Sequence, residues 1–110
     1  MADEPIERAI DEAERLFVRA GQSKVAAEAM DYRRKRVRAA LIVKYKGDGN
    51  AQGMSEHMAE ADPVYELALA DWETAAMEAE TLRAQAEAKR LRFEAWRTQA
   101  ATRRAEMNLR

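Results

Sequence analysis

Residues 64–110, VYELALADWETAAMEAETLRAQAEAKRLRFEAWRTQAATRRAEMNLR, contain no glycine and no proline. Asp62 and Pro63 stand directly before them. This pair is typical of a helix start, because a carboxylate accepts a free backbone N–H and proline lacks a donor that the first turn leaves unused. The stretch therefore predicts one long helix over about residues 63–108, which at 1.5 Å per residue reaches about 65–70 Å.

Apolar residues recur along this predicted helix in alternating steps of four and three, the spacing of a left-handed coiled-coil face. We call this face the seam; its members are Ala68, Trp72, Ala75, Ala79, Leu82, Ala86, Lys89, Phe93, Trp96, Ala100, Arg103 and Met107. Before Leu82 the seam suits packing within the chain as well as between chains. Beyond Leu82 we expect it to contact a second copy or another partner, with Lys89 and Arg103 as polar residues that fix the register.

Two shorter helices are expected upstream of the long one. Asp3, Glu4 and Pro5 predict the start of a helix over about residues 4–20, and Gly21 and Ser23 indicate its end and the cap of the next. A second helix is expected over about residues 24–46. Its apolar period of about 3.6 residues runs through Val25, Ala29, Tyr32, Arg36, Ala39, Ala40 and Val43.

Residues 47–53, GDGNAQG, hold three of the four glycines and predict a loop, the main hinge of the chain. A short helical turn is expected to follow from Ser55 to about Ala61. Folded back, the helix over residues 24–46 is about 35 Å long and covers only about half of the long helix. The prediction is a single all-α domain over residues 1–110: an antiparallel helical hairpin or bundle with a long, coiled-coil-like C-terminal helix.

Charge is segregated along the chain although the formal net charge is only −1. Residues 55–80 carry eight acids and no Lys or Arg, whereas residues 24–46 carry eight bases against two acids, and residues 81–110 eight against three. The basic middle segment is expected to pair with the acidic first half of the long helix. The basic C-terminal half has no acidic segment left in the chain to neutralise it.

The sequence lacks the residues that several classes of function require. Cysteine is absent, no Gly-rich phosphate loop or dinucleotide motif occurs, and His57 is the single histidine. We therefore expect a non-enzymatic protein with no catalytic residue, cofactor, metal or small-molecule substrate. No apolar run approaches the ~18 residues that a membrane span needs, so no membrane partner and a cytoplasmic location are expected.

The basic C-terminal half supplies the candidate binding residues. Those expected to contact a partner protein are Leu82, Phe93, Trp96, Arg97 and Met107, and those expected to contact an anionic nucleic acid are Arg90, Arg92, Arg103 and Arg104. The alternative is that the aromatics only pack within the seam and the arginines only face solvent. A further alternative is that the acidic run from Glu56 to Glu80 imitates a nucleic acid and inhibits a host nuclease or defence complex.

Residues 91–98, LRFEAWRT, followed by Ala101 and residues 103–107, RRAEM, resemble a segment of a family of small helical bacteriophage proteins. The resemblance extends over roughly the last 55 residues, with the FEAWRT core its most specific part. Members tend to be encoded among phage recombination and replication genes. The resemblance implies a protein in the cytoplasm of a bacterial host, acting beside a DNA-annealing or single-strand-binding protein. We expect a homodimer that binds a protein partner, single-stranded DNA, or both.

Overall fold

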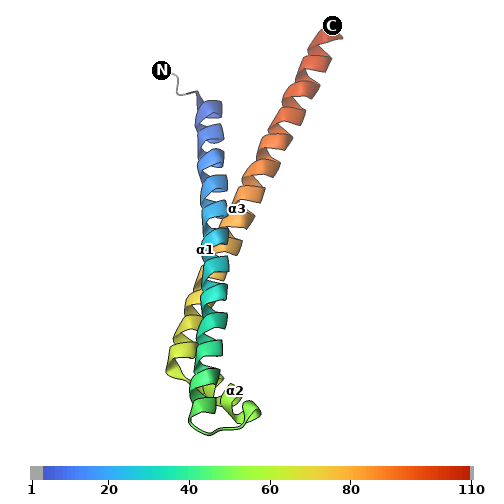
Figure 1. The fold of residues 1–110 in the computed structure, drawn as a ribbon. Coiled ribbons are helices and arrows are strands. Elements are labelled where there is room, and N and C mark those ends of the chain that lie inside the picture. Colours follow the sequence, from blue (N-terminus) through green and yellow to red (C-terminus); the bar gives the residue numbers. More distant parts are fainter. Residues whose placement is uncertain (1–3, 110) are drawn as a thin grey trace.

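Two long antiparallel helices joined through a short one form the chain, as a computed structural model of residues 4–109 shows (Figure 1). α1 spans Pro5–Gly47, α2 spans Gln52–Ala61 and α3 spans Pro63–Asn108. Residues 4–109 contain no strand. The predicted all-α class, the hairpin and the long C-terminal helix are confirmed, and α3 has the predicted bounds.

α1 is one continuous helix of 43 residues, so the predicted break at Gly21 and Ser23 is wrong. A glycine inside a helix costs about 1 kcal/mol relative to alanine, which packing can offset. The packed residues of α1 keep one spacing of three and four through Gly21: Ala13, Leu16, Ala20, Ser23, Ala27, Met30, Arg34, Val37 and Leu41 are buried or half-buried. Ser23 belongs to this packed face of α1 and does not cap a helix.

The stripe that the sequence indicated in the second half of α1 faces solvent. Val25 is 65% exposed, Tyr32 65% and Val43 71%. This stripe and the packed face of α1 both repeat at helical spacing. The packed face includes the charged residue Arg34, so a search for apolar residues alone does not find it. The predicted seam of α3 is correctly placed from Ala68 to Phe93, where its members are buried or half-buried. Beyond Phe93, the seam members Trp96, Arg103 and Met107 are exposed.

The loop between α1 and α2 is shorter than predicted, because Gln52 and Gly53 already belong to α2. Gly49 has φ of 98°, a conformation that favours glycine. Hydrogen bonds hold the turn: the Asn50 N–H and the Asn50 side-chain amide both donate to the Tyr45 carbonyl, at 3.2 and 2.9 Å, and the Gly49 N–H donates to the Lys46 carbonyl at 3.0 Å. The predicted short helix around Ser55–Ala61 is confirmed and begins three residues earlier.

α2 closes the hairpin over the small core cluster of Leu41, Ala59 and Tyr65. Ala59 is fully buried. The start of α3 is fixed by Asp62, whose carboxylate accepts the Val64 N–H at 2.8 Å, as predicted, and also accepts the Tyr45 hydroxyl. Hydrogen bonding from Tyr45 is the largest cause that lowers the pKa of Asp62 below its ordinary value.

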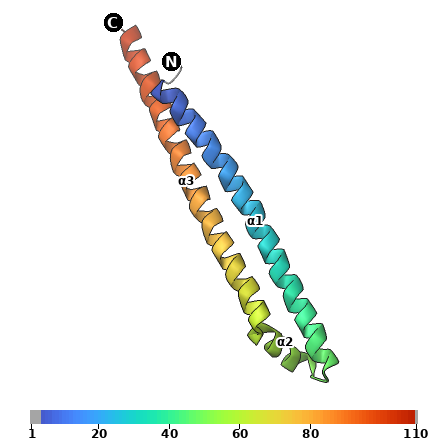
Figure 2. The ribbon, with the colours of Figure 1, turned by 90° about the vertical axis from the view of Figure 1, so that its left-hand side faces the viewer.

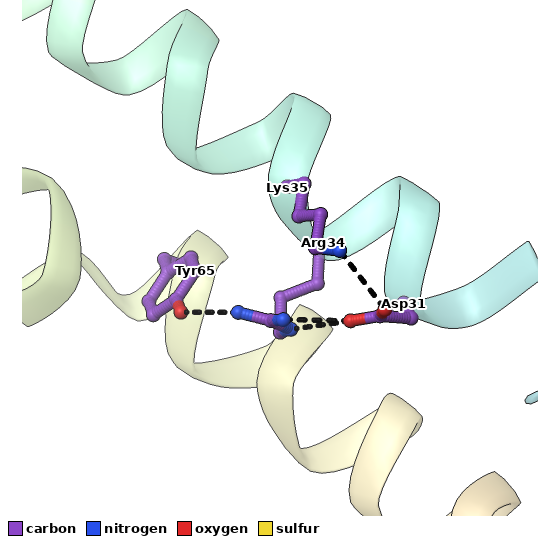
Figure 3. Close-up of polar contacts among 4 residues, drawn as sticks. All are labelled: Asp31, Arg34, Lys35 and Tyr65. Atoms are coloured by element: carbon purple, nitrogen blue, oxygen red, sulfur yellow. Dashed lines mark hydrogen bonds and ion pairs between the residues drawn. The ribbon is translucent and has the colours of Figure 1, made fainter. Parts of the chain in front are cut away.

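A polar clamp, Asp31, Arg34, Lys35 and Tyr65, joins the two long helices above this core (Figure 3). The Arg34 guanidinium donates to Asp31 at 2.6 Å and to the Tyr65 hydroxyl at 3.1 Å, and it lies 4.8 Å from the centre of the Trp72 ring. The hydrogen bond from Arg34 is the main cause that lowers the pKa of Asp31. Arg34 thus places one level of α1 beside one level of α3.

The molecule is a rod of 85 × 30 × 14 Å with a radius of gyration of 24.0 Å, against about 13 Å for a compact domain of this length. Figure 2 shows α1 running beside α3 for most of its length. α1 extends further along α3 than the predicted helix over residues 24–46 would, because α1 is 43 residues long. The fully buried residues of α3 nevertheless end at Ala86, about half-way along the helix. Near the other end of the pair, the Lys89 ammonium lies 3.8 Å from the Glu12 carboxylate.

The continuity of α1 predicts that Gly21→Ala stabilises the chain. A Cβ at this position meets nothing within 4 Å, so the substitution should raise the free energy of unfolding by about 0.5–1 kcal/mol. Gly49→Ala is the matched control and should lower it by about 1–2 kcal/mol, because an L residue is strained at a positive φ. Urea unfolding followed by circular dichroism, at low protein concentration so that association does not contribute, measures both. A destabilising Gly21→Ala would mean that α1 is interrupted there.

Acid sensitivity is predicted at the α2–α3 junction. The pKa of Asp62 is lowered in the folded chain, so its contribution to stability is present above its ordinary value of 3.8 and is lost as the pH falls through the folded value. Tyr45→Phe removes the main cause of this shift and should lower the thermal midpoint at pH 7 while reducing the further loss at pH 3. Thermal unfolding at the two pH values tests this. An equal acid loss in both proteins would show that Tyr45 does not set the Asp62 pKa.

Candidate functional site: the open end of the hairpin

The two long helices diverge toward the start of α1 and the end of α3 (Figure 1). An apolar hollow of about 550 Å³ lies between them at this open end. From α1 it is lined by Pro5, Ile6, Ala9 and Ala13, together with Glu4. From α3 it is lined by Lys89, Arg92, Phe93 and Trp96. The last turns of α3 continue beyond the region that α1 covers.

The first turn of α1 is held by local contacts at this site. Glu4 is the N-cap residue and its carbonyl accepts the Arg8 N–H at 3.2 Å, while Pro5 occupies the first turn as predicted. The Glu4 side chain makes no capping hydrogen bond. Asp3, the other expected cap, lies outside the described residues. Ile6 is half-buried and points its apolar side chain toward the hollow.

Two aromatic side chains of α3 form the centre of the open end. The rings of Phe93 and Trp96 stack with centroids 6.0 Å apart and an interplanar angle of 26°. Phe93 is half-buried, and Trp96 is 50% exposed. A second, more open hollow on their other side is bounded by Arg97, Ala101 and Arg104. One face of the aromatic pair therefore meets α1, and the other is accessible next to two arginines.

The arginines of α3 differ in whether their charge is compensated. Arg90 donates to Glu87 and Glu94, and these carboxylates raise its pKa. Arg90 is therefore a poor candidate for nucleic-acid contact, contrary to the expectation from sequence. No carboxylate partner is found among residues 4–109 for the exposed side chains of Arg92, Arg97, Arg103 and Arg104.

Leu82 does not belong to the open end. It is 7% exposed and lies on the buried face of α3 that packs against α1. The expectation that it contacts a partner is therefore corrected: its place in the seam is right, but α1 of the same chain covers it. Met107 is 72% exposed near the end of α3 and remains accessible, away from the hollow.

The charge environment of the open end also differs from expectation. Because α1 is unbroken, its acidic first half lies beside the basic half of α3, which the sequence reading had left without an acidic neighbour. Lys89 and Glu12 form the ion pair across this junction. The basic residues in the middle of α1 pair with Asp31 of the same helix and, through Arg38, with Glu60 of α2 at 3.0 Å. Pairing of these bases with acids of α3 is not found in the described chain.

Sequence reasoning missed the α1 side of the hollow. Ile6 and Ala13 were assigned to a short separate helix, so nothing placed them beside Phe93. The sequence contains a signal for a single helix. The packed residues of α1 keep alternating steps of three and four from Ala13, past Gly21, to Leu41, and this spacing is kept only within one helix that faces one partner.

Three further features of the described chain bear on other classes of function. In residues 4–109, no group of three or more His, Cys, Asp or Glu side chains is arranged to hold a metal ion. Within the same range, no helix contains an apolar stretch long enough to cross a membrane. Glu73 and Glu78 belong to the acidic run considered as a nucleic-acid mimic, and they line a separate shallow surface of α3 with Arg19 nearby.

Comparison with known proteins returns no match: no family model fits the chain, and neither the curated proteins nor the solved structures contain a similar one.

The different positions of Leu82 and Trp96 predict different effects on folding. Leu82→Ala removes a buried side chain from the α1–α3 contact and should lower the free energy of unfolding by about 2 kcal/mol or more. Trp96→Ala removes a half-exposed ring and should lower it by about 1 kcal/mol or less. Urea unfolding of dilute protein measures both. A Leu82→Ala variant as stable as the wild type would indicate that this residue serves a partner and not the hairpin.

Proposed function

We propose that this chain is a non-enzymatic helical protein that binds single-stranded DNA through the open end of the hairpin, as a component of phage DNA recombination or replication. The observation that carries the proposal is the half-exposed Phe93–Trp96 stack, beside which Arg97 and Arg104 have no carboxylate partner in the described chain. Guanidinium groups follow phosphates, and exposed aromatic rings stack on unpaired bases. The resemblance of residues 91–98 to phage proteins supports the same setting.

The position of these residues favours an unpaired strand over a duplex. An aromatic ring at the centre of a site is useful only where bases are free to stack on it. The acidic first half of α1 lies on the opposite side of the hollow and repels phosphates. A strand would therefore follow the outer side of α3, past Arg97, Ala101 and Arg104, and leave the side toward α1 free.

A protein partner is the second candidate, and the apolar side of the hollow favours it. Ile6, Ala9 and Ala13 offer an apolar wall opposite Phe93, with Lys89 and Arg92 at the border. An amphipathic segment with acidic residues would match this surface. Binding of a protein on this side and of DNA on the other side of Phe93–Trp96 are compatible.

Fluorescence anisotropy of a labelled single-stranded oligonucleotide, titrated at low and moderate salt, tests the DNA-binding proposal. Arg97→Ala/Arg104→Ala should weaken binding and reduce the slope of log K against log salt by about 1.4, since each lost phosphate contact contributes about 0.7 for a single strand. Trp96→Ala should weaken binding by about 1–3 kcal/mol through the loss of one stacked base.

The matched control is Arg33→Ala/Arg36→Ala, which removes two exposed arginines of α1 that also have no carboxylate partner in the described chain. This variant should bind the oligonucleotide like the wild type. Absence of salt-sensitive binding by the wild type, or an equal loss in the control, would contradict the proposal. If the wild type shows no salt-sensitive binding, the open end would be assigned to the protein partner.

A further inference from the structure

The side of α1 that points away from α3 carries a second coiled-coil face. Its members are exposed and follow one another in alternating steps of three and four residues. We call it the back face of α1, and it consists of Arg15, Val18, Gln22, Val25, Ala29, Tyr32, Arg36, Ala39, Val43 and Lys46. Val25 is 65% exposed, Tyr32 65% and Val43 71%, so large apolar side chains of this face meet solvent in the hairpin.

α3 has the same arrangement on its own outer side. The back face of α3 consists of Leu67, Ala70, Thr74, Met77, Thr81, Ala84, Ala88 and Leu91, which are exposed and again alternate in steps of three and four. Leu67 is 64% exposed, Met77 73% and Leu91 53%. Each long helix therefore uses one coiled-coil face inside the hairpin and presents another that is uncovered in residues 4–109.

The two back faces differ in charge. On and directly beside the back face of α1 lie six bases and two acids: Arg15, Arg19, Arg33, Lys35, Arg36 and Lys46, with Glu14 and Glu28. On and directly beside the back face of α3, residues 66–81 contribute five acids and no base: Glu66, Asp71, Glu73, Glu78 and Glu80. Among these side chains, only Lys35 and Glu80 take part in ion pairs within residues 4–109, each with a residue of its own helix. The opposite charges on the two outer sides of the hairpin are thus largely uncompensated.

The contacts inside the hairpin show how the two back faces are aligned. Arg34 lies beside Tyr65 and Trp72, and Glu12 lies beside Lys89. Because α1 and α3 are antiparallel (Figure 2), these two levels fix which residues of the helices share a height along the rod. The back faces therefore overlap in height, on opposite sides of the molecule.

We propose that the back face of α1 in one copy packs antiparallel against the back face of α3 in a second copy, at the register that the hairpin uses between its own helices. At this register Val25 comes about level with Met77, and Tyr32 about level with Ala70. Both contacts are apolar, and in the second the small side chain leaves room for the large one. The same repeat of three and four on both faces lets the contact continue over several turns.

Charged side chains at the edges of this contact favour the same pairing. Arg33 comes about level with Asp71, and Arg36 about level with Glu66. These four side chains have no ion-pair partner in residues 4–109, so the contact brings opposite charges together without breaking an existing pair. Each such surface pair contributes little by itself, so the apolar side chains between them carry most of the contact.

A second copy is the occupant that both back faces select. An anionic lipid surface suits the basic face of α1, since a basic amphipathic helix can lie on such a surface, but it leaves the acidic and apolar face of α3 uncovered. A second copy offers each face a surface of opposite charge and equal spacing. Because two different faces meet, the contact is heterologous, and copies can add one after another.

This association goes beyond the proposed DNA binding, because neither back face includes a residue of the open end. It also differs from the predicted contact through the seam, most of which packs inside the hairpin. It covers Val25, Tyr32 and Val43, the part of the α1 stripe that faces solvent in a single chain.

Sedimentation velocity of the full chain over a range of concentrations tests the association. The mean mass of the wild type should rise with concentration beyond that of a dimer, because a heterologous dimer still has one free face of each kind. Arg33→Glu/Arg36→Glu should weaken association about tenfold or more, since two attractive pairs become repulsive. Glu66→Arg/Asp71→Arg should weaken it to the same degree.

Mixing these two variants is the decisive measurement. In an equal mixture, the reversed back face of α1 in one variant meets the reversed back face of α3 in the other, and the two unchanged faces also match. The mixture should therefore associate like the wild type although neither variant does so alone. Within one chain the altered residues lie on opposite outer sides of the hairpin, so the restored pairing is between copies.

Lys24→Glu/Arg83→Glu is the matched control, because it makes the same change in net charge on another side of the hairpin, where both residues line one hollow. This variant should associate like the wild type. Met77→Ser should weaken association about tenfold or more. Its helix content by circular dichroism should stay unchanged, because Met77 is exposed in the single chain.

Glu28 and Glu73 are a like-charged pair that comes about level at the proposed register. Glu28→Lys turns this repulsion into attraction and should strengthen association about threefold. An unchanged or weaker association of this variant would overturn the proposed register.

A wild type that stays monomeric at all concentrations, or an equal mixture as weak as the single variants, would overturn the proposal. A monomeric wild type that instead sediments with vesicles of phosphatidylserine and phosphatidylcholine would also overturn it and assign the back face of α1 to a lipid surface. The labelled oligonucleotide titrated with Arg33→Glu/Arg36→Glu reports DNA binding separately, so the failure of either proposal is recognised by itself.

Discussion

The packing of α1 against α3 along a single seam is the constraint on which the rest of this structure depends. The molecule is one layer of side chains thick between two helices, so each residue of the seam contacts only the opposite helix. Two of its three buried members, Ala68 and Ala86, are small, and Ala27 is a small buried residue on the packed face of α1. Close approach of the helices thus replaces the bulky core of a globular domain. Arg34 adds specificity, because a guanidinium bonded to Asp31 and Tyr65 fits only one level of the opposite helix.

The closed end and the open end follow from the same pairing. At the closed end α2 adds a third element, so Ala59 and Tyr65 are buried and the helices are held together by Asp62 and Tyr45. Toward the other end nothing replaces α2, and the helices diverge (Figure 1). The side chains there remain half-buried or exposed. A surface suited to binding therefore arises where the packing of the hairpin becomes incomplete.

Local signals in the sequence predicted those features that depend on neighbouring residues. The proline and carboxylate at residues 62 and 63 and the absence of glycine afterwards were enough for α3 and its seam. Gly21 led to the wrong prediction of a helix end. The free-energy cost of a glycine in a helix is a local effect, whereas the contacts that offset this cost come from α3. Because of this predicted break, Ile6 was not placed beside α3 at the open end. For the same reason, α1 was not recognised as the helix that covers Leu82. Arg34 hid the inner face of α1, since a half-buried arginine on a packed face becomes acceptable only when Asp31, Tyr65 and Trp72 surround it.

A hairpin of this kind buries little apolar surface for its length. Its fully buried apolar residues are few, and large side chains such as Phe17, Trp96 and Met107 stay exposed. A folded state with a thin core gains comparatively much from any ligand that binds it and not the unfolded chain. Covering the Phe93–Trp96 stack with bases would add apolar contact where the hairpin alone lacks it. Binding at the open end is therefore expected to stabilise the fold that presents it.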